Sequence, residues 1–494
     1  MQQLAVLVFA VGILGLFLLN RDRRARTSKA LWIPVVWLLI AGSRNVGEWS
    51  QTLTLGRPIG IGSSDAYLEG NPVDRNVLGG LIALGIIVLF RRRRQVGALL
   101  RRNAPILLYF FYCGASILWS DYPAVAFRRW PRALGDLVMV MVVLTDPDRS
   151  AALKRLLART GFVLVPLSIL LIRYYPELGR SYGADGTPSW GGVTGGKNSL
   201  GMICLIFGLG SAWRFLAAYQ DKNAPDRKRL LIAHGALLVM TLYLLREANS
   251  ATSLACFVLA GGVMVLTSQL ALARKPAIMH LLVVGVVSVS LFALFFDSGG
   301  NLVGTLGRNS TLTGRTDVWK RVLGIVQNPL FGSGFESFWL GARLEYMRRL
   351  DEGLNQAHNG YLEVYLNLGG IGLALLAVMM VRGYRNIVVG LRRDQDVSRL
   401  MLAYFVVAVI YNCTESGFKM MSPIWVFFLL ALMVVAKDSR RRNFDESGSS
   451  GRARMSTASV TSEPCMPVVE IQHVSANRFR WSDVEITEAH QRKP

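Results

Sequence analysis

The feature that most constrains this chain is a long series of apolar segments, each close to the length of a membrane-spanning helix, about 17–25 residues. Hydrophobic residues make up 52% of the sequence, too much for a soluble chain that still carries many charges. The pattern predicts an all-α, polytopic membrane bundle of about 12–13 transmembrane helices. The segments lie near residues 4–19, 30–43, 77–90, 104–119, 133–145, 161–175, 199–219, 230–245, 251–273, 277–297, 361–381, 399–413 and 423–436.

The series ends near residue 436, where the composition changes to Ser, Arg and Glu with few apolar clusters. We therefore expect a transmembrane domain over 1–436 and a disordered cytoplasmic tail over 437–494. One long insertion, at about 298–360, is expected to form a helical external loop. Within it, residues 315–327 carry an apolar stripe with helical spacing, and a second helix is expected over 336–350.

The net charge of +23 is compatible with nucleic acid binding, but membrane topology explains it better. Lys and Arg gather in alternate loops, as the positive-inside rule requires of cytoplasmic loops. If residues 21–29 lie inside, then Arg91–Arg94 and Arg440–Arg442 also lie inside and the loop 298–360 lies outside. We therefore expect no nucleic acid partner. The five cysteines form no C-x-x-C pair, so neither a disulfide framework nor a zinc site is expected.

A histidine stands where the long loop meets the next apolar segment. His358-Asn359 is followed by nine residues and then by Gly369 and Gly372. Imidazole is the side chain best suited to move protons near neutral pH. The alternative is an interfacial histidine that only caps the helix. The spacing predicts that His358 shares one helical face with both glycines, which would allow another helix to approach closely.

Several arginines lie on the side of the membrane assigned to the long loop, although Lys and Arg otherwise gather on the cytoplasmic side. Arg128 and Arg132 precede one apolar segment, Arg246 ends another, and Arg315 begins the first helix of the loop. Guanidinium groups suit phosphate and pyrophosphate. For any single arginine, pairing with anionic lipid headgroups or nearby carboxylates is the simpler explanation. Several arginines on the same side of the membrane as one histidine favour a phosphate-bearing lipid substrate.

Residues 191–198 nearly match the phosphate-loop pattern G-x-x-x-x-G-K-[ST], but Asn198 replaces the Ser or Thr that would hold magnesium. No βαβ unit surrounds the segment, so a nucleotide site is not expected. The segment could instead bind an anion through backbone N–H groups and Lys197, and a glycine turn before a membrane helix explains it equally well. No His, Asp or Glu cluster has metal-ligand spacing, so no metal or cofactor is expected.

Spaced motifs in this chain resemble those of the bacterial O-antigen ligases and the related O-antigen and exopolysaccharide polymerases. They are G-R-T-D-V-W at 314–319, N-P-L-F-G-S-G-F at 328–335, and the histidine motif, which fits H-[NSQ]-x9-G-x-x-G. The segment G-G-K-N-S-L-G at 195–201 is similar to the G-H-K-N-x-L-G signature of exopolysaccharide-production members. The similarity covers residues 100–436 and is strongest over 314–372.

The resemblance implies a multi-helix transferase that uses undecaprenyl-pyrophosphate-linked oligosaccharide at the periplasmic face of the bacterial inner membrane, without a metal. It assigns the family histidine to His358 and the loop arginine to Arg315. Gly196 replaces the histidine of the exopolysaccharide signature, and Ala251 replaces the arginine of an S-R-T motif, which leaves the second pyrophosphate ligand open. The candidates for binding pyrophosphate or glycan are Arg246, Arg128, Arg132, Lys197, Asn198 and Asn359.

The resulting hypothesis is a metal-independent, inverting glycosyltransferase. His358 would accept the proton of the attacking sugar hydroxyl, or would only position a substrate, and Arg315 would stabilise the leaving pyrophosphate. A polymerase adds the glycan to another lipid-linked repeat and a ligase adds it to lipid A core; the G-x-K-N-x-L-G segment favours the polymerase. Membrane lipids and a chain-length regulator or export protein are further expected partners.

An alternative of another class is a lipid-linked glycan flippase or exporter. Such a protein needs charged residues within its helices, lining a path. Asp136 and Arg246 are both expected near helix ends, which favours an enzyme that works at one face.

Overall fold

The computed structural model describes residues 1–22, 26–55, 70–182, 188–268, 276–296, 311–350, 354–392 and 394–433. The chain divides into two units, Met1–Ala436 and Lys437–Pro494, and the description below concerns the first. The tail and residues 297–310 of the long loop lie outside the described residues. Helices dominate the described part of the chain, so the predicted all-α membrane class is confirmed.

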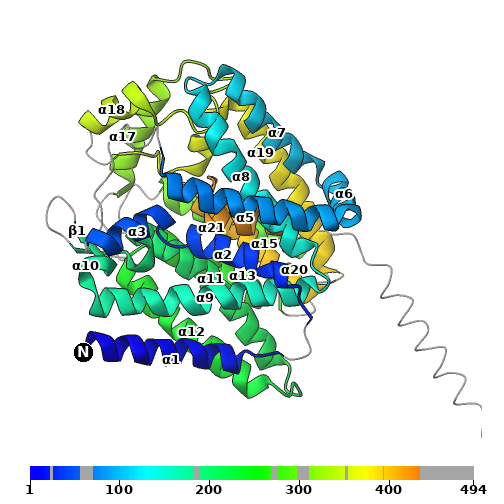
Figure 1. Cartoon of the computed structure of the whole chain (residues 1–494). Coiled ribbons are helices and arrows are strands. Elements are labelled where there is room, and N and C mark those ends of the chain that lie inside the picture. The colour runs from blue at the N-terminus through cyan, green and yellow to red at the C-terminus, as the bar shows by residue number, and fades with distance from the viewer. Residues whose placement is uncertain are drawn as a thin grey trace, which may run out of the picture. The chain divides into compact units, whose positions relative to one another are not determined.

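The described elements are, in chain order and with the labels of Figure 1, α1 (Gln2–Leu19), η1 (Lys29–Leu31), α2 (Trp32–Ala41), α3 (Val46–Leu55), α5 (Pro72–Arg91), α6 (Arg93–Arg102), α7 (Ala104–Ala115), η2 (Ser116–Trp119), α8 (Pro123–Leu144), α9 (Arg149–Tyr174), α10 (Pro176–Gly179), β1 (Arg180–Tyr182), β2 (Pro188–Trp190), η3 (Gly192–Thr194), α11 (Lys197–Gln220), α12 (Arg227–Ala248), α13 (Ala251–Leu266), α15 (Pro276–Phe296), α17 (Thr311–Gly324), α18 (Gly341–Leu350), α19 (Gly360–Leu391), α20 (Gln395–Tyr411) and α21 (Pro423–Leu432). Strands β1 and β2 pair antiparallel, with Arg180 opposite Trp190.

Six of the described helices are long and apolar enough to cross a membrane, namely α1, α5, α9, α11, α12 and α19. The segment Lys29–Ala41 and the following helix Val46–Thr54 meet at 58° and make a seventh if they form one broken span. The expected number of spans was larger because several apolar segments fold as helices of fewer than 18 residues, among them Ala251–Leu266 and Pro423–Leu432.

The centre of the bundle is formed by helices that are apolar on every side. All ten residues of α21 are buried. In both α9 and α11, 72% of the 18-residue apolar stretch that could span a membrane is buried. Helix α11 packs against α9, α12 and α13, while α20 packs against α13, α19 and α21. By contrast, only 11% of the corresponding stretch of α1 is buried. Figure 1 shows α1 at the edge of the bundle beside α9 and α12, so its exposed apolar surface faces lipid.

Helix α19 is interrupted at Gly369, whose backbone is not helical (φ 64°, ψ −166°). The loop between α17 and α18 fills the interruption. On one side of the break, the N–H of Gly370 donates to the carbonyl oxygen of Pro329 at 2.9 Å; on the other, the N–H of Ser333 donates to the carbonyl oxygen of Leu366 at 3.1 Å. The loop therefore satisfies backbone groups that the interrupted helix leaves without partners.

The prediction that His358 and Gly369 share one helical face is wrong. His358 precedes the helix in the left-handed backbone region (φ 51°), and Asn359 is the N-cap residue. Gly369 admits a loop rather than a neighbouring helix, because a Cβ atom there would lie 2.2 Å from the carbonyl oxygen of Leu330. The histidine and this glycine mark the start and the break of one helix.

The second expected helix of the long loop is shorter than predicted. It begins at Gly341 instead of residue 336, and ends at Leu350. Positive φ angles at Glu336 (52°) and Gly341 (53°) keep the residues between them out of helical geometry. The first loop helix, α17, is shifted toward the N-terminus from the predicted 315–327, since it begins at Thr311 and ends at Gly324.

Asp136 lies in the middle of α8 rather than near a helix end, because α8 begins at Pro123, well before the apolar segment. The carboxylate is fully buried and accepts hydrogen bonds from Trp37 Nε1 at 2.8 Å and from the N–H of Met421 at 2.9 Å. These bonds join α2, α8 and the turn between α20 and α21. Asp136 therefore connects packed elements and does not line a transport path.

The break in α19 yields a stability prediction. Gly369→Ala should lower the thermal stability of the detergent-solubilised protein, because a left-handed alanine costs about 1–3 kcal/mol and its Cβ would collide with Leu330. Gly370→Ala is the matched control, since a Cβ there meets nothing closer than 3.7 Å. Thermal unfolding of both variants measures the difference. Equal stability of the two would contradict the described contact between the loop and the helix.

Candidate functional site

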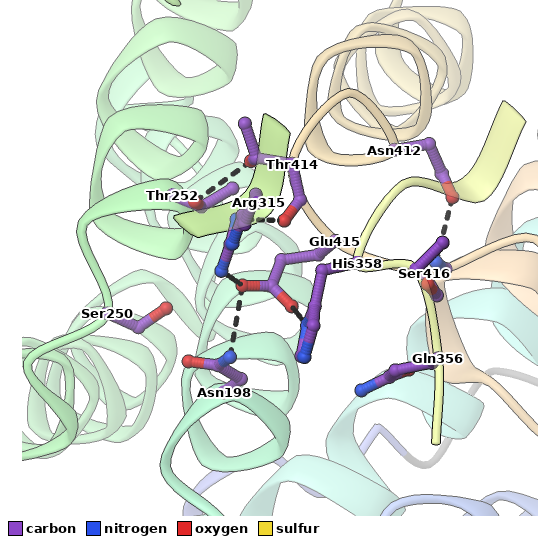
Figure 2. Close-up of polar contacts among 12 residues, drawn as sticks. Asn198, Ser250, Thr252, Arg315, Gln356, His358, Asn412, Thr414, Glu415 and Ser416 are labelled. Atoms are coloured by element: carbon purple, nitrogen blue, oxygen red, sulfur yellow. Dashed lines mark hydrogen bonds and ion pairs between the residues drawn. The ribbon is translucent and has the colours of Figure 1, made fainter. Parts of the chain in front are cut away.

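A buried carboxylate, Glu415, forms the centre of a polar cluster in the turn between α20 and α21 (Figure 2). Its Oε1 accepts hydrogen bonds from Arg315 Nη2 at 2.8 Å and from Asn198 Nδ2 at 3.0 Å. Its Oε2 lies 3.2 Å from His358 Nδ1. The donors come from α17, the first turn of α11 and the segment before α19. We refer to Asn198, Arg315, His358 and Glu415 as the Glu415 cluster.

The environment of Glu415 favours its charged form. The side chain is only 6% exposed, so protein groups must replace the water that would otherwise solvate the charge. Burial raises the pKa of this carboxyl group, but the hydrogen bond with His358 and the positive charge of Arg315 together lower it by more. The net pKa lies below the ordinary glutamate value. Glu415 is therefore ionised at neutral pH and binds its donors more strongly than a neutral acceptor would.

Arg315 is fixed by two different acceptors of the same turn. Besides its bond to Glu415, its Nη1 donates to the carbonyl oxygen of Thr414. The Thr414 hydroxyl is in turn 3.0 Å from the hydroxyl of Thr252, near the start of α13. A guanidinium group has five N–H donors in one plane, and the contacts with the described residues use two of them.

His358 presents one ring nitrogen to Glu415 and the other away from it. An Nδ1–H that donates to the carboxylate leaves Nε2 with the free lone pair, and within the described residues no hydrogen bond engages Nε2. The side chain is 29% exposed, so a ligand can reach the ring. The next residue, Asn359, caps α19, since its Oδ1 accepts the N–H groups of Tyr361 at 3.1 Å and Leu362 at 3.0 Å.

Gly360 brings the histidine segment into direct contact with the turn that carries Glu415. Its N–H donates to the carbonyl oxygens of Asn412 at 2.8 Å and Glu415 at 3.1 Å. A Cβ atom at this position would lie 1.9 Å from Asn412 Oδ1. Only glycine therefore allows the two backbones to approach closely enough for the bond between His358 and Glu415.

The structure brings Arg315, His358 and Asn198 together, but the other predicted ligands lie elsewhere. Lys197 is exposed on the first turn of α11, next in sequence to Asn198. Arg132 is half-buried on α8 and lines a large cavity. Arg128 is exposed on α8, and Arg246 is exposed on the last turn of α12. None of these four belongs to the Glu415 cluster.

The glycine-rich segment before α11 surrounds a cation of the chain itself. The buried Arg44 donates from Nη2 to the carbonyl oxygen of Leu178 at 2.7 Å and from Nη1 to that of Gly192 at 3.5 Å. Gly195 adopts a left-handed conformation (φ 78°) against this guanidinium, and α11 begins two residues later. The segment is thus a glycine turn whose position sets that of Asn198.

A cavity of about 830 Å³ lies beside the Glu415 cluster. Gln356 and Ser416 line it, and they are near neighbours in sequence of His358 and Glu415. From α8, Arg132 also lines it. The volume is within the range of about 300–1,000 Å³ found for small-ligand sites. In the part of the chain that the structure describes, no group of three or more His, Cys, Asp or Glu side chains is placed to hold a metal ion.

Sequence reasoning missed Glu415, the residue that holds the cluster together. A signal was present, because Thr414-Glu415-Ser416 is a polar triplet between two strongly apolar segments. A carboxylate in a short turn between two apolar helices is expected to find partners elsewhere in the fold. Arg44 was missed for a similar reason, since its acceptors are distant in sequence.

Comparison with known proteins shows similarity to one family of membrane proteins. Residues 235–377 match the family model described as O-antigen ligase. The chain is also 26% identical over 291 residues to "Exopolysaccharide production protein ExoQ" of Rhizobium meliloti (strain 1021). That alignment covers 56% of this chain and 64% of the relative, so the chain spans somewhat less than two thirds of it. Arg315 and His358 lie inside the matched family segment, whereas Asn198 and Glu415 lie outside it. The chain is therefore a multi-pass membrane protein that is similar to the O-antigen ligase and polymerase superfamily.

Proposed function

We propose that this protein polymerises an undecaprenyl-pyrophosphate-linked glycan for exopolysaccharide or O-antigen synthesis, at the periplasmic face of the bacterial inner membrane. The Glu415 cluster carries the proposal, because it holds an imidazole and a guanidinium on one ionised carboxylate. The family match and the exopolysaccharide production relative support this class of activity. The distribution of Lys and Arg among the loops supports the periplasmic orientation.

In this proposal, His358 is the general base. A sugar hydroxyl of the acceptor is a poor nucleophile, so its proton passes to Nε2 of His358 as its oxygen bonds to the anomeric carbon. The positive imidazolium that results lies 3.2 Å from Glu415, whose ionised carboxylate stabilises it. Glu415 also keeps the proton of the resting imidazole on Nδ1, and so leaves Nε2 basic.

The bond between the anomeric carbon and the pyrophosphate oxygen breaks as the new glycosidic bond forms. The leaving lipid pyrophosphate gains negative charge, which the remaining N–H donors of Arg315 stabilise. Asn198 and the exposed Lys197 stand at the start of α11, where the helix N-terminus adds a partial positive charge. Direct displacement inverts the configuration at the anomeric carbon.

The proposed polymerase activity predicts a specific set of products in cells without this protein. Long polymer should disappear, and single repeat units should remain attached to lipid or to lipid A core. Glycan analysis of a deletion strain, with a plasmid-complemented strain as control, measures this outcome. Long polymer that accumulates on undecaprenyl lipid would show a ligase instead, as the family description also allows.

The general-base role predicts a large loss of turnover on replacing His358. His358→Asn should reduce transfer about 10²–10⁴-fold, because asparagine tolerates the left-handed backbone but cannot accept a proton. His358→Gln should show a similar loss of turnover, because glutamine cannot accept a proton either. Glu415→Gln should also reduce kcat, because an amide cannot stabilise the imidazolium charge. The assay follows transfer from purified undecaprenyl-pyrophosphate-linked glycan in detergent.

The control for these variants is Gln327→Ala, an exposed amide in the loop after α17. It should retain wild-type turnover, and all four proteins should show similar expression and gel-filtration profiles. A His358→Gln protein with normal turnover would mean that the histidine only positions a substrate.

The phosphate-binding role of Arg315 depends on its fork geometry. Arg315→Ala should reduce transfer about 10²–10³-fold. Arg315→Lys should recover little, because an ammonium lacks the planar fork that lets the guanidinium contact Thr414 and Glu415 and also present paired N–H donors to a phosphate. Arg321→Ala, an exposed arginine in the last turn of the same helix, is the matched control and should remain active. Full activity of the lysine variant would reduce Arg315 to a simple positive charge.

A further inference from the structure

The cavity beside the Glu415 cluster has the lining of a carbohydrate site. Its walls come from α3 and the residue before it, the start of α5, α7, α8, the residues around Trp339, the segment before His358, α19 and the turn after Glu415. Carboxamides both donate and accept hydrogen bonds, as sugar hydroxyls require, and aromatic rings pack against the apolar faces of sugars. Six carboxamides line the cavity: Asn45, Gln51, Asn71, Asn355, Gln356 and Asn367. Asn367 is held by the protein itself, since its Oδ1 accepts two backbone N–H groups and its Nδ2 donates to the carbonyl oxygen of Glu363. Four aromatic residues join them: Tyr109, Phe335, Trp339 and Phe418.

The charged groups of this cavity are largely engaged by the protein. Glu336 pairs with Arg129 at 3.8 Å, and Glu48 pairs with Arg44 at 3.5 Å. Asp74 accepts the N–H of Gly47 at 2.9 Å. The lining includes four acidic and three basic side chains, so neither sign of charge dominates. Such a cavity fits an uncharged oligosaccharide better than a pyrophosphate or another polyanion.

Glu363 joins the walls of this cavity to the segment that carries His358. Its Oε2 accepts Trp339 Nε1 at 2.7 Å, and its Oε1 accepts the N–H of Ala357. The Ser416 hydroxyl is 3.5 Å from the same Oε1. Because these contacts are made within the protein itself, the cavity has a fixed position relative to His358 before any ligand binds.

The cavity and the Glu415 cluster extend in different directions from the histidine. In Figure 2, Gln356 and Ser416 are on one side of His358, and Arg315 and Asn198 are on the other. Gln356 and Ser416 line the cavity, whereas Arg315 and Asn198 do not. An in-line displacement requires the attacking hydroxyl and the leaving pyrophosphate to occupy opposite sides of the anomeric carbon. In the proposed reaction, a cavity on the side of His358 away from Arg315 suits the acceptor.

We propose that this cavity binds the acceptor oligosaccharide, an uncharged glycan, and so sets which acceptor the protein extends. This inference rests on the proposed transfer reaction and adds the location and chemical class of its second substrate. The wall formed by α3 is the best place to test it, because Asn45 and Gln51 are exposed amides there and neither belongs to the Glu415 cluster.

The test compares the double variant Asn45→Ala, Gln51→Ala with Gln327→Ala, an exposed amide that lies outside this cavity. The probe is the oligosaccharide released by mild acid from the lipid-linked glycan of the cells that make this protein. Loss of two hydrogen bonds to a neutral ligand should weaken binding at least about tenfold in the double variant. Calorimetric titration of the full-length protein in detergent measures it, and the control should bind like the wild type.

A kinetic measurement distinguishes an effect on acceptor binding from an effect on donor binding. With the free oligosaccharide as acceptor and the lipid-linked glycan as donor, the double variant should show an acceptor KM raised at least about tenfold. Its kcat and donor KM should stay within about twofold of the wild type. A raised donor KM with an unchanged acceptor KM would overturn the assignment.

The binding and kinetic measurements also distinguish a failure of the cavity assignment from a failure of the proposed function. Unchanged oligosaccharide binding in the double variant overturns the cavity assignment, even if the wild type transfers glycan. Binding lost only in the double variant supports a glycan site in the cavity. A wild type that binds the oligosaccharide but never transfers glycan would instead contradict the proposed function.

Discussion

The arrangement of the candidate site depends on one buried charge. Glu415 is ionised in a position that is almost closed to water, and it stays ionised because Arg315, His358 and Asn198 supply hydrogen bonds and positive charge. Removing one partner of such a group leaves an uncompensated charge, which is far more costly than losing a surface ion pair. The carboxylate therefore holds α11, α17, the start of α19 and the turn after α20 in one arrangement.

A second constraint acts through backbone rather than side chains. The break at Gly369 frees peptide groups in the middle of an apolar helix, where unpaired polar groups cost several kcal/mol. The glycine-rich loop that contains Pro329 pairs with them, and this fixes the residues that follow the loop. Trp339 is thereby placed to bond with Glu363, so the break in the helix also shapes the cavity wall.

These two constraints give the proposed reaction its direction. The Glu415 cluster places a guanidinium on one side of His358, and the amide-lined cavity lies on the other. A donor bound by its pyrophosphate and an acceptor bound by its sugars would then meet at the imidazole. Because Asn45 and Gln51 line the cavity without belonging to the Glu415 cluster, substitutions there can change acceptor recognition without removing the charged cluster.

The sequence by itself determined the membrane class, because apolar segments of this length have few other stable states, and its motifs singled out His358 and Arg315. The sequence also singled out Asn198, as part of a glycine-rich segment that resembles a phosphate loop. In the structure that segment is the turn before α11. Only the tertiary structure decided that Glu415 joins these residues, that Gly360 permits the contact and that Gly369 receives a loop. Local patterns report periodicity and turns, whereas a buried carboxylate is stabilised by donors that are distant in sequence, here 57, 100 and 217 residues away. Such partnerships exist only after the chain has folded.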